Sequence, residues 1–340
     1  MRPTTKDLAA MAGVSLATVD RVLNDRAGVR KDTVARVNQA IEKLGFTRNI
    51  VAASLARGRS YQFLFLLPRT GDQFLAGLMA RIKETNLAFA AEMISVDVLQ
   101  IHESDPHAIA RFLGSLDPAA IDGVAIMAPE SPQVRDAKAR LAERGIDAIS
   151  FIAGQIDGAH DDFVGIDNHA AGATAGRLMG RFSSLRPQKV LVIAETMQAR
   201  DSLERRLGFD QVINADYAHL SVLPSIETHG DRDRAIRVIQ NSFAGHDSIA
   251  GVYILGSEAR LPLEIIAGLP PHQRPVIIAH ERTPFTEASL LSGRIDALIT
   301  QDPGHLVRSA IRILRARKDR RKILASQEKI RIEILLKENI

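Results

Sequence analysis

Short apolar runs alternate with helical patterns from residue 61 to residue 300, and this alternation restricts the possible folds most strongly. The first strand-like runs lie at 61–68, 91–99, 122–127 and 148–152, with helical patterns at 74–86, 105–116 and 131–144. The rhythm restarts with runs at 163–166, 189–194, 220–224, 251–255, 275–279 and 297–300, and helices at 170–184, 200–215, 231–244 and 259–267. Apolar strands separated by helices predict parallel sheets covered on both faces. Two passes predict an α/β fold with two similar, doubly wound lobes.

The first 24 residues predict two short helices joined by a tight turn. Thr4 and Asp7 have the spacing of a capping box at the start of the first helix. Gly13 suits the turn, because it lacks the Cβ that resists a left-handed backbone. Ser15 can cap the second helix. A helix, a glycine turn and a second helix are typical of a helix-turn-helix head, whose second helix enters the DNA major groove.

The spacing of apolar residues separates the inner and outer faces of these helices. We expect Leu8 and Met11 on the inward side of the first helix. In the second helix, Val19, Val22 and Leu23 form one stripe, and the more exposed positions are Leu16, Ala17, Asp20, Arg21 and Asn24. An ordinary helical hairpin with a solvated face is the alternative interpretation.

A third helix is predicted over residues 31–44, with Gly45 as its stop. The next segment, residues 49–58, reads Asn-Ile-Val-Ala-Ala-Ser-Leu-Ala-Arg-Gly. Through residue 60 the chain resembles the N-terminus of LacI/GalR-type bacterial transcription regulators (the lactose-repressor family), in which this segment is a hinge helix. Isolated helices below about 12–15 residues are marginal in water. We therefore expect the hinge to order only when it docks on a second copy and on DNA.

The resemblance also implies which residues contact DNA. The expected set is Thr5, Ser15, Leu16, Ala17, Thr18, Arg21, Asn24, Asn49, Ala52, Leu55 and Ala56. Arg21 is the candidate for a bidentate contact to guanine. Leu55 resembles the apolar wedge that enters the minor groove, and a core leucine under a linker is its alternative role. Asp20 departs from the small hydroxyl residue common in the family, so we expect it to pair on the helix surface.

Charge and composition limit the classes of function. Residues 1–60 hold eleven Lys and Arg against five Asp and Glu, so this part carries +6 of a chain whose net charge is +4. A basic N-terminal part suits phosphate contacts. The chain has no cysteine, which excludes disulfides, a thiol nucleophile and cysteine-based metal sites. It begins with no apolar signal segment and has no run of 18 apolar residues, so we expect a cytoplasmic protein with no membrane partner.

Residues 61–340 resemble the ribose-type periplasmic sugar-binding proteins, whose two-lobed fold is shared by the effector domain of LacI-type regulators. The landmarks are residues 165–172 (Gly-Ile-Asp-Asn-His-Ala-Ala-Gly), Arg205 ahead of Gly208-Phe209, and Gln301-Asp302-Pro303. The resemblance implies effector contacts in the cleft by Phe74, Glu130, Arg205, Glu281 and Gln301. Other roles remain open: solvated loop acids for Glu130 and Glu281, a core anchor for Phe74 and an interlobe salt bridge for Arg205.

Several smaller features have simple interpretations. Asn168 can cap the helix that follows it, and the glycines of residues 172–176 indicate a helix face packed closely on the sheet. Gly256-Ser257 stands where the resemblance leads us to expect an Asn-Asp pair. His280-Glu281, residues 160–162 and His246-Asp247 are typical of polar loops rather than of metal sites. We find no serine-nucleophile elbow, phosphate loop or zinc-protease motif.

These observations lead to one prediction for the whole chain. A helix-turn-helix domain (1–48) and a hinge (49–60) precede a two-lobed effector and dimerisation domain (61–340). Lobe 1 is expected over about 61–154 plus 302–325, and lobe 2 over about 155–301 plus 326–340. We expect a regulator, not an enzyme, that binds operator DNA as a homodimer or tetramer under the control of a sugar-like or polyol effector, without a cofactor or metal. A transport-linked sugar receptor and a sugar-modifying enzyme with a DNA-binding head are the alternatives.

Overall fold

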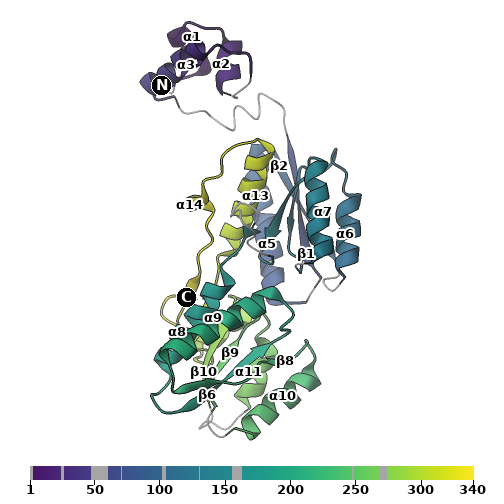
Figure 1. Cartoon of the computed structure of the whole chain (residues 1–340), viewed down its shortest axis with the longest axis vertical. Coiled ribbons are helices and arrows are strands. Elements are labelled where there is room, and N and C mark those ends of the chain that lie inside the picture. Colours follow the sequence, from purple (N-terminus) through teal and green to yellow (C-terminus); the bar gives the residue numbers. More distant parts are fainter. Residues whose placement is uncertain are drawn as a thin grey trace. The chain divides into compact units, whose positions relative to one another are not determined.

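Figure 1 traces the chain in the computed structural model, which describes residues 3–23, 27–46, 60–69, 71–101, 105–129, 131–154, 163–246, 249–268 and 274–340. Some predicted residues lie outside these ranges: Asn24, Asn49, Ala52, Leu55, Ala56 and Glu130, together with residues 160–162 and Asp247. The chain divides into two units. One unit holds the described residues up to Ser60 with Ala91–Met93, and the other holds the rest.

The N-terminal unit contains three helices, α1 (Thr5–Ala12), α2 (Leu16–Leu23) and α3 (Lys31–Leu44). The predicted capping box is present: the Thr4 amide donates to Asp7 Oδ2 at 2.7 Å, and the Asp7 amide donates to Thr4 Oγ1 at 3.3 Å. Gly13 has a φ of 62°, the left-handed conformation that the turn requires. The Thr18 amide donates to Ser15 Oγ at 3.2 Å. The local chemistry of the two helices and their turn is therefore as predicted.

The three helices bury one apolar cluster that includes Leu8, Val19, Val22 and Val37. The prediction for Met11 is wrong, because its side chain is 50% exposed. The inward face of α1 is made by Leu8, Ala9 and Ala12. Helical residues lie about 100° apart, so a face centred on those three residues leaves Met11 at its margin.

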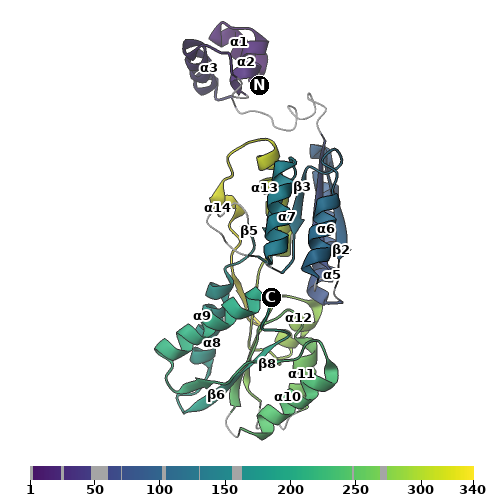
Figure 2. The same cartoon turned by 45° about the vertical axis from the view of Figure 1, so that its right-hand side comes forward.

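Lobe 1 is a parallel five-stranded sheet in the order β2-β1-β3-β4-β5. Its strands are β1 (Tyr61–Pro68), β2 (Ile94–Ile101), β3 (Gly123–Ile126), β4 (Asp147–Phe151) and β5 (Phe163–Val164). On β1, between β2 and β3, Phe65 lies in register with Val98 of β2 and Ala125 of β3. One face packs on α5 (Gln73–Phe89), which runs into a short 3₁₀ turn (Ala90–Glu92), and on α13 (Pro303–Lys318). The other face packs on α6 (Pro106–Ser115) and α7 (Pro132–Glu143) (Figure 2).

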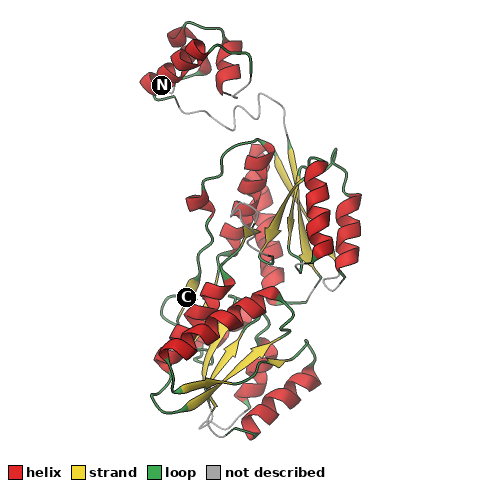
Figure 3. Ribbon diagram, viewed as in Figure 1, coloured by secondary structure: helices red, strands yellow, loops and turns green. Residues whose placement is uncertain are grey.

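Lobe 2 is a seven-stranded sheet in the order β12-β11-β10-β9-β6-β7, with β8 paired to β6. Its strands are β6 (Gln188–Ala194), β7 (Leu220–Val222), β8 (Ile226–Glu227), β9 (Ile249–Ile254), β10 (Val276–His280), β11 (Ala297–Thr300) and the antiparallel β12 (Glu333–Leu335). One face packs on α8 (Asn168–Phe182) and α9 (Arg200–Asp216). The other packs on α10 (Arg232–Ala244), α11 (Arg260–Ala267) and α12 (Pro284–Leu291) (Figure 3).

The border between the lobes differs from the expected one at one strand. β5 pairs with β4, through Ser150 with Phe163 and Phe151 with Val164, so it belongs to lobe 1 and not to lobe 2. Within the described residues, the chain crosses between the lobes after β5, after β11 and again on its way through α14 (Ala325–Glu328) to β12. The apolar residues Ile311 and Leu314 of α13 are fully buried.

Candidate functional site

Polar residues gather at the carboxyl ends of the lobe 2 strands, the edge at which parallel α/β sheets bind ligands. They follow four strands: Glu195 after β6, Ser257 and Glu258 after β9, Glu281 after β10, and Gln301 after β11. Two of the five predicted effector residues, Glu281 and Gln301, therefore lie at the edge where the fold places ligands.

Arg205 on α9 is the centre of a buried hydrogen-bonded cluster. Its Nε donates to Asn168 Oδ1 at 2.8 Å, its Nη1 to the Leu255 carbonyl oxygen at 2.7 Å, and its Nη2 to Glu281 Oε1 at 3.3 Å. Gln301 Nε2 donates to the same Glu281 oxygen at 3.2 Å. Arg205 and Glu281 are each 3% exposed, and Gln301 is 1% exposed. All these residues belong to lobe 2, so these contacts of Arg205 do not bridge the lobes.

Two acceptors in this cluster have no hydrogen-bond donor among the described residues: Glu281 Oε2 and Gln301 Oε1. Buried polar atoms are normally paired, because an unmade bond costs about 1–3 kcal/mol. Glu281 also has a φ of 63°, and such left-handed residues other than glycine gather at ligand sites. Burial raises the pKa of Glu281, although Arg205 and Gln301 both favour its ionised form. The cluster is thus incomplete on its acceptor side.

Close contact between α8 and α9 positions Arg205. A Cβ on Gly172 would lie 1.9 Å from the Arg205 carbonyl oxygen, and a Cβ on Gly208 would lie 1.9 Å from the His169 carbonyl oxygen. The small face of α8 therefore packs on α9 rather than on the sheet, which corrects the prediction. Asn168 is corrected as well. The cap of α8 is Asp167, whose Oδ1 accepts from the Ala170 amide at 2.9 Å, and this leaves Asn168 free to bind Arg205.

An aromatic pair and a histidine lie behind the cluster. The ring of Tyr253 stacks on Phe209 with centroids 4.6 Å apart, and its hydroxyl is 2.7 Å from His280 Nε2. Burial and the nearby Arg205 charge lower the pKa of His280, so its ring is neutral. The prediction of a polar loop at His280 is wrong, because the residue ends β10 and is fully buried. The sequence did hold a signal for this burial: His280 directly continues the apolar run of residues 276–279, so it could have been assigned to the same strand.

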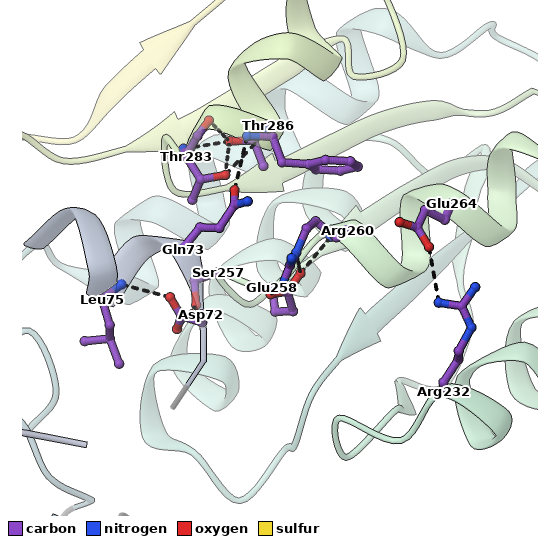
Figure 4. Close-up of polar contacts among 11 residues, drawn as sticks. Asp72, Gln73, Leu75, Arg232, Ser257, Glu258, Arg260, Glu264, Thr283 and Thr286 are labelled. Atoms are coloured by element: carbon purple, nitrogen blue, oxygen red, sulfur yellow. Dashed lines mark hydrogen bonds and ion pairs between the residues drawn. The ribbon is translucent and has the colours of Figure 1, made fainter. Parts of the chain in front are cut away.

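Lobe 1 meets lobe 2 at the start of α5 (Figure 4). Asp72 caps α5 by accepting from the Leu75 amide at 2.9 Å, and its second oxygen accepts from the Ser257 hydroxyl at 3.1 Å. Gln73 Oε1 accepts from the Phe285 amide at 3.2 Å. Phe74, the predicted stacking residue, is 5% exposed and belongs to none of the apolar clusters among the described residues. Sequence reasoning missed Asp72 and Ser257, because their partnership spans 185 residues.

Six of the predicted DNA-contacting residues in the N-terminal unit are described, and each is at least partly accessible to solvent. Thr5, Ser15, Ala17 and Arg21 are exposed, and Leu16 is 47% exposed although it is apolar. Thr18 is half-buried, with its hydroxyl 2.9 Å from that of Ser15. An apolar side chain left in solvent, on the same helix as an exposed arginine, suits contact with thymine methyl groups and base edges.

No group of three or more His, Asp or Glu side chains within the described ranges has the arrangement of a metal site. None of the helices described is long and apolar enough to cross a bilayer.

Two family models match the chain. Residues 4–49 match the bacterial regulatory proteins of the lacI family, and residues 63–322 match the periplasmic binding protein domain. Among characterised relatives, the HTH-type transcriptional regulator RegA of Clostridium saccharobutylicum is 35% identical over 136 residues, which cover 40% of this chain and 39% of RegA. For four further regulators of this class, the match covers between 25% and 42% of the relative.

Solved structures match the fold over a larger part of the chain. A solute-binding protein of Burkholderia graminis, solved with D-arabinose, has a TM-score of 0.70 at 18% identity and covers 82% of this chain and 96% of its own. A putative LacI transcriptional regulator of Bacteroides fragilis has a TM-score of 0.69 at 18% identity, with 83% and 98% covered. The chain belongs to the family of the periplasmic binding protein domain, which its residues 63–322 match, and it carries in residues 4–49 the helix-turn-helix region of the lacI family of bacterial regulatory proteins.

Proposed function

We propose that this protein is a ligand-responsive transcription regulator, acting in the cytoplasm as a repressor. In this proposal a homodimer, or a tetramer built from it, binds a pseudo-palindromic operator, as two-fold helix-turn-helix proteins do. A small polyhydroxylated effector occupies the cluster of Arg205, Glu281 and Gln301 and is bound without being transformed. The single observation that carries the proposal is that one chain joins a DNA-binding head to a binding domain whose buried polar cluster is incomplete.

The chemistry of the cluster supports a hydroxyl-bearing effector. Glu281 Oε2 and Gln301 Oε1 each lack a donor among the described residues, and two hydroxyls of a sugar can supply two donors. Phe74 can add a ring face from lobe 1, and Glu130 is proposed as a further contact on the same lobe.

The lobe contacts supply a route to regulation. An effector between the lobes changes the balance between contacts such as Ser257–Asp72 and an arrangement that lacks them. Such a ligand regulates DNA binding only if it prefers one arrangement over the other. We propose that the preferred arrangement alters how the hinge residues, including Asn49, Ala52, Leu55 and Ala56, meet the minor groove. Asn24 completes the proposed phosphate contacts of the head.

Selection of duplexes from a randomised library with the full chain tests the proposal. We expect enrichment of one pseudo-palindrome, and a change of at least about tenfold in operator affinity when the effector is added. In Gln301→Met, which keeps the side-chain volume but removes the unpaired acceptor, operator binding should remain and the response should be lost. Gln133→Met on α7 is the matched control and should respond as the wild type. The absence of any sequence preference at low salt would overturn the proposal.

A further inference from the structure

The described part of the site is richer in negative charge than a neutral sugar requires. Glu195 and Glu258 follow β6 and β9 at the edge where Glu281 and Gln301 lie, Asp201 stands in the first turn of α9, and Asp72 from lobe 1 is bound by Ser257 at that edge. We call these four residues the acidic rim. The Ser257 hydroxyl bound to Asp72 fixes that carboxylate against the loop that carries Glu258. The acidic rim therefore contains carboxylates from both lobes.

Two arginines at this edge are already paired with carboxylates. Arg205 is bound to Glu281 at 3.3 Å, and Arg260 holds Glu258 through two contacts of 2.9 Å. His229 lies 4.0 Å from Glu227. With Arg260 cancelling Glu258, and Arg205 cancelling Glu281, the remaining carboxylates of Asp72, Glu195 and Asp201 leave the edge net negative.

Two observations connect the acidic rim to the buried cluster. The first is geometric: the unpaired atoms at the centre, Glu281 Oε2 and Gln301 Oε1, are both acceptors, and their side chains are at least 97% buried. A ligand must supply donors to them. The second is electrostatic: Asp201 raises the pKa of Glu281 and also that of Glu195, on which burial, Asp72 and Glu258 act in the same direction. The rim carboxylates are thus close enough to act on one ligand.

We propose that the effector, whose existence rests on the proposed function, is a polyhydroxylated amine, and that the acidic rim selects it over neutral, acidic and phosphorylated molecules of the same scaffold. The buried acceptors bind its hydroxyl or ammonium donors, and the rim stabilises its positive charge. An anion at the same place meets unpaired acceptors and carboxylates, with no free cation among the rim and cluster residues.

Matched sets of ligands test the charge preference with the full chain. Each set holds a neutral hexose or pentose, its amino counterpart, its sugar acid and its phosphate. Thermal shift finds the scaffolds that bind, and titration calorimetry then gives Kd. We expect the amine to bind about three- to tenfold more tightly than the neutral sugar, as one extra charge pair at partly solvated separations provides, and the anions to bind more weakly than both. An anion as best ligand, equal binding of amine and neutral sugar, or no binding by any set would overturn the inference.

Charge-removing variants then show whether the rim is responsible. In Glu195→Gln the preference for the amine should fall at least about threefold, while Kd for the neutral sugar stays within about twofold. In Asp72→Asn, whose amide can still cap α5, the preference for the amine should fall by at least the same factor. Glu143→Gln, an exposed acid on α7, is the control and should keep the preference. A preference that persists in both rim variants would contradict the inference.

Operator binding by the same preparations separates this inference from the proposed function. Release from a selected operator by an anionic effector would leave the regulator intact and overturn the charge preference. A chain that binds amines as expected but no DNA sequence would support the rim and overturn the regulator.

Discussion

The hydroxyl of Tyr61 donates a 2.7 Å hydrogen bond to Asp319 Oδ1, which joins the first residue of β1 to the residue after α13. The Arg315 guanidinium lies over the Tyr61 ring, 5.4 Å from its centroid. Since α13 begins two residues after Gln301, one helix connects the candidate effector site with the residue at which the binding domain starts.

Tyr61→Phe should lower the free energy of unfolding by about 1.5–3 kcal/mol, because a buried hydrogen bond to a charged acceptor is lost while the ring remains. Urea denaturation of the full chain measures this change. Tyr217→Phe is the matched control: its hydroxyl contacts Arg177 only at 3.4 Å, so its loss should stay below about 1 kcal/mol. Equal losses in the two variants would contradict the assigned strength of the Tyr61 bond.

Gly208→Ala should destabilise the protein by at least about 3 kcal/mol, because its Cβ would meet the His169 carbonyl oxygen at 1.9 Å and force two helix backbones apart. It should also weaken effector binding, since Arg205 lies on the displaced helix. Gly256→Ala has nothing within 4 Å and serves as the control, with a change within about 0.5 kcal/mol. Thermal and urea unfolding of both variants measure these changes. A Gly208→Ala variant as stable as the wild type would refute the close contact between the backbones of α8 and α9.

Glu281 should make stability depend on pH. Its pKa in the folded chain is raised above the ordinary value of 4.5 because burial outweighs the pull of Arg205. The folded state therefore holds the proton more tightly, so this contribution is fully present below about pH 4.5 and is lost as pH rises through the higher folded pKa.

A pH series of urea unfolding compares the wild type with Glu281→Gln, which cannot titrate. The free energy of unfolding of the wild type should fall relative to the variant as pH rises from about 4.5. If the difference in unfolding free energy between the two proteins is constant with pH, or grows in favour of the wild type, the pKa of Glu281 is not raised in the folded state.

Arg21→Ala should cost about 1–3 kcal/mol at the selected operator and relax specificity at one base pair. Lys43→Ala removes the same charge from the exposed end of α3 and should weaken binding to all sequences alike, if at all. Electrophoretic mobility assays with specific and scrambled duplexes measure both. Equal loss of specific and non-specific binding in Arg21→Ala would indicate a phosphate contact instead.

Local signals were sufficient for most elements of the fold. The capping box at Thr4 and the left-handed Gly13 act within a few residues, and α3 begins and ends at the predicted Lys31 and Leu44. The alternation of strands and helices also predicted where Glu281 and Gln301 lie, because each ends an apolar run.

Three incorrect predictions concern features that depend on contacts between residues far apart in the sequence. Asn168 and Asp167 are equally good caps by sequence, and only the approach of Arg205 from 37 residues away separates their roles. The glycines on α8 indicated close packing without naming the partner helix. Two-residue β5 is too short to show from its pattern which sheet it joins.

After β11 the chain returns from lobe 2 to lobe 1, and this return affects the order in which the two lobes can fold during translation. Leu306, Ile311 and Leu314 of α13 fill the core against the first sheet, yet α13 follows β11, the last parallel strand of lobe 2, in chain order. Lobe 1 is synthesised before lobe 2, and the face of its sheet that packs on α5 and α13 stays partly uncovered until α13 has emerged. Vectorial, domain-by-domain folding is the general rule during translation, but here the lobe that begins first is completed only after the parallel strands of the other already exist.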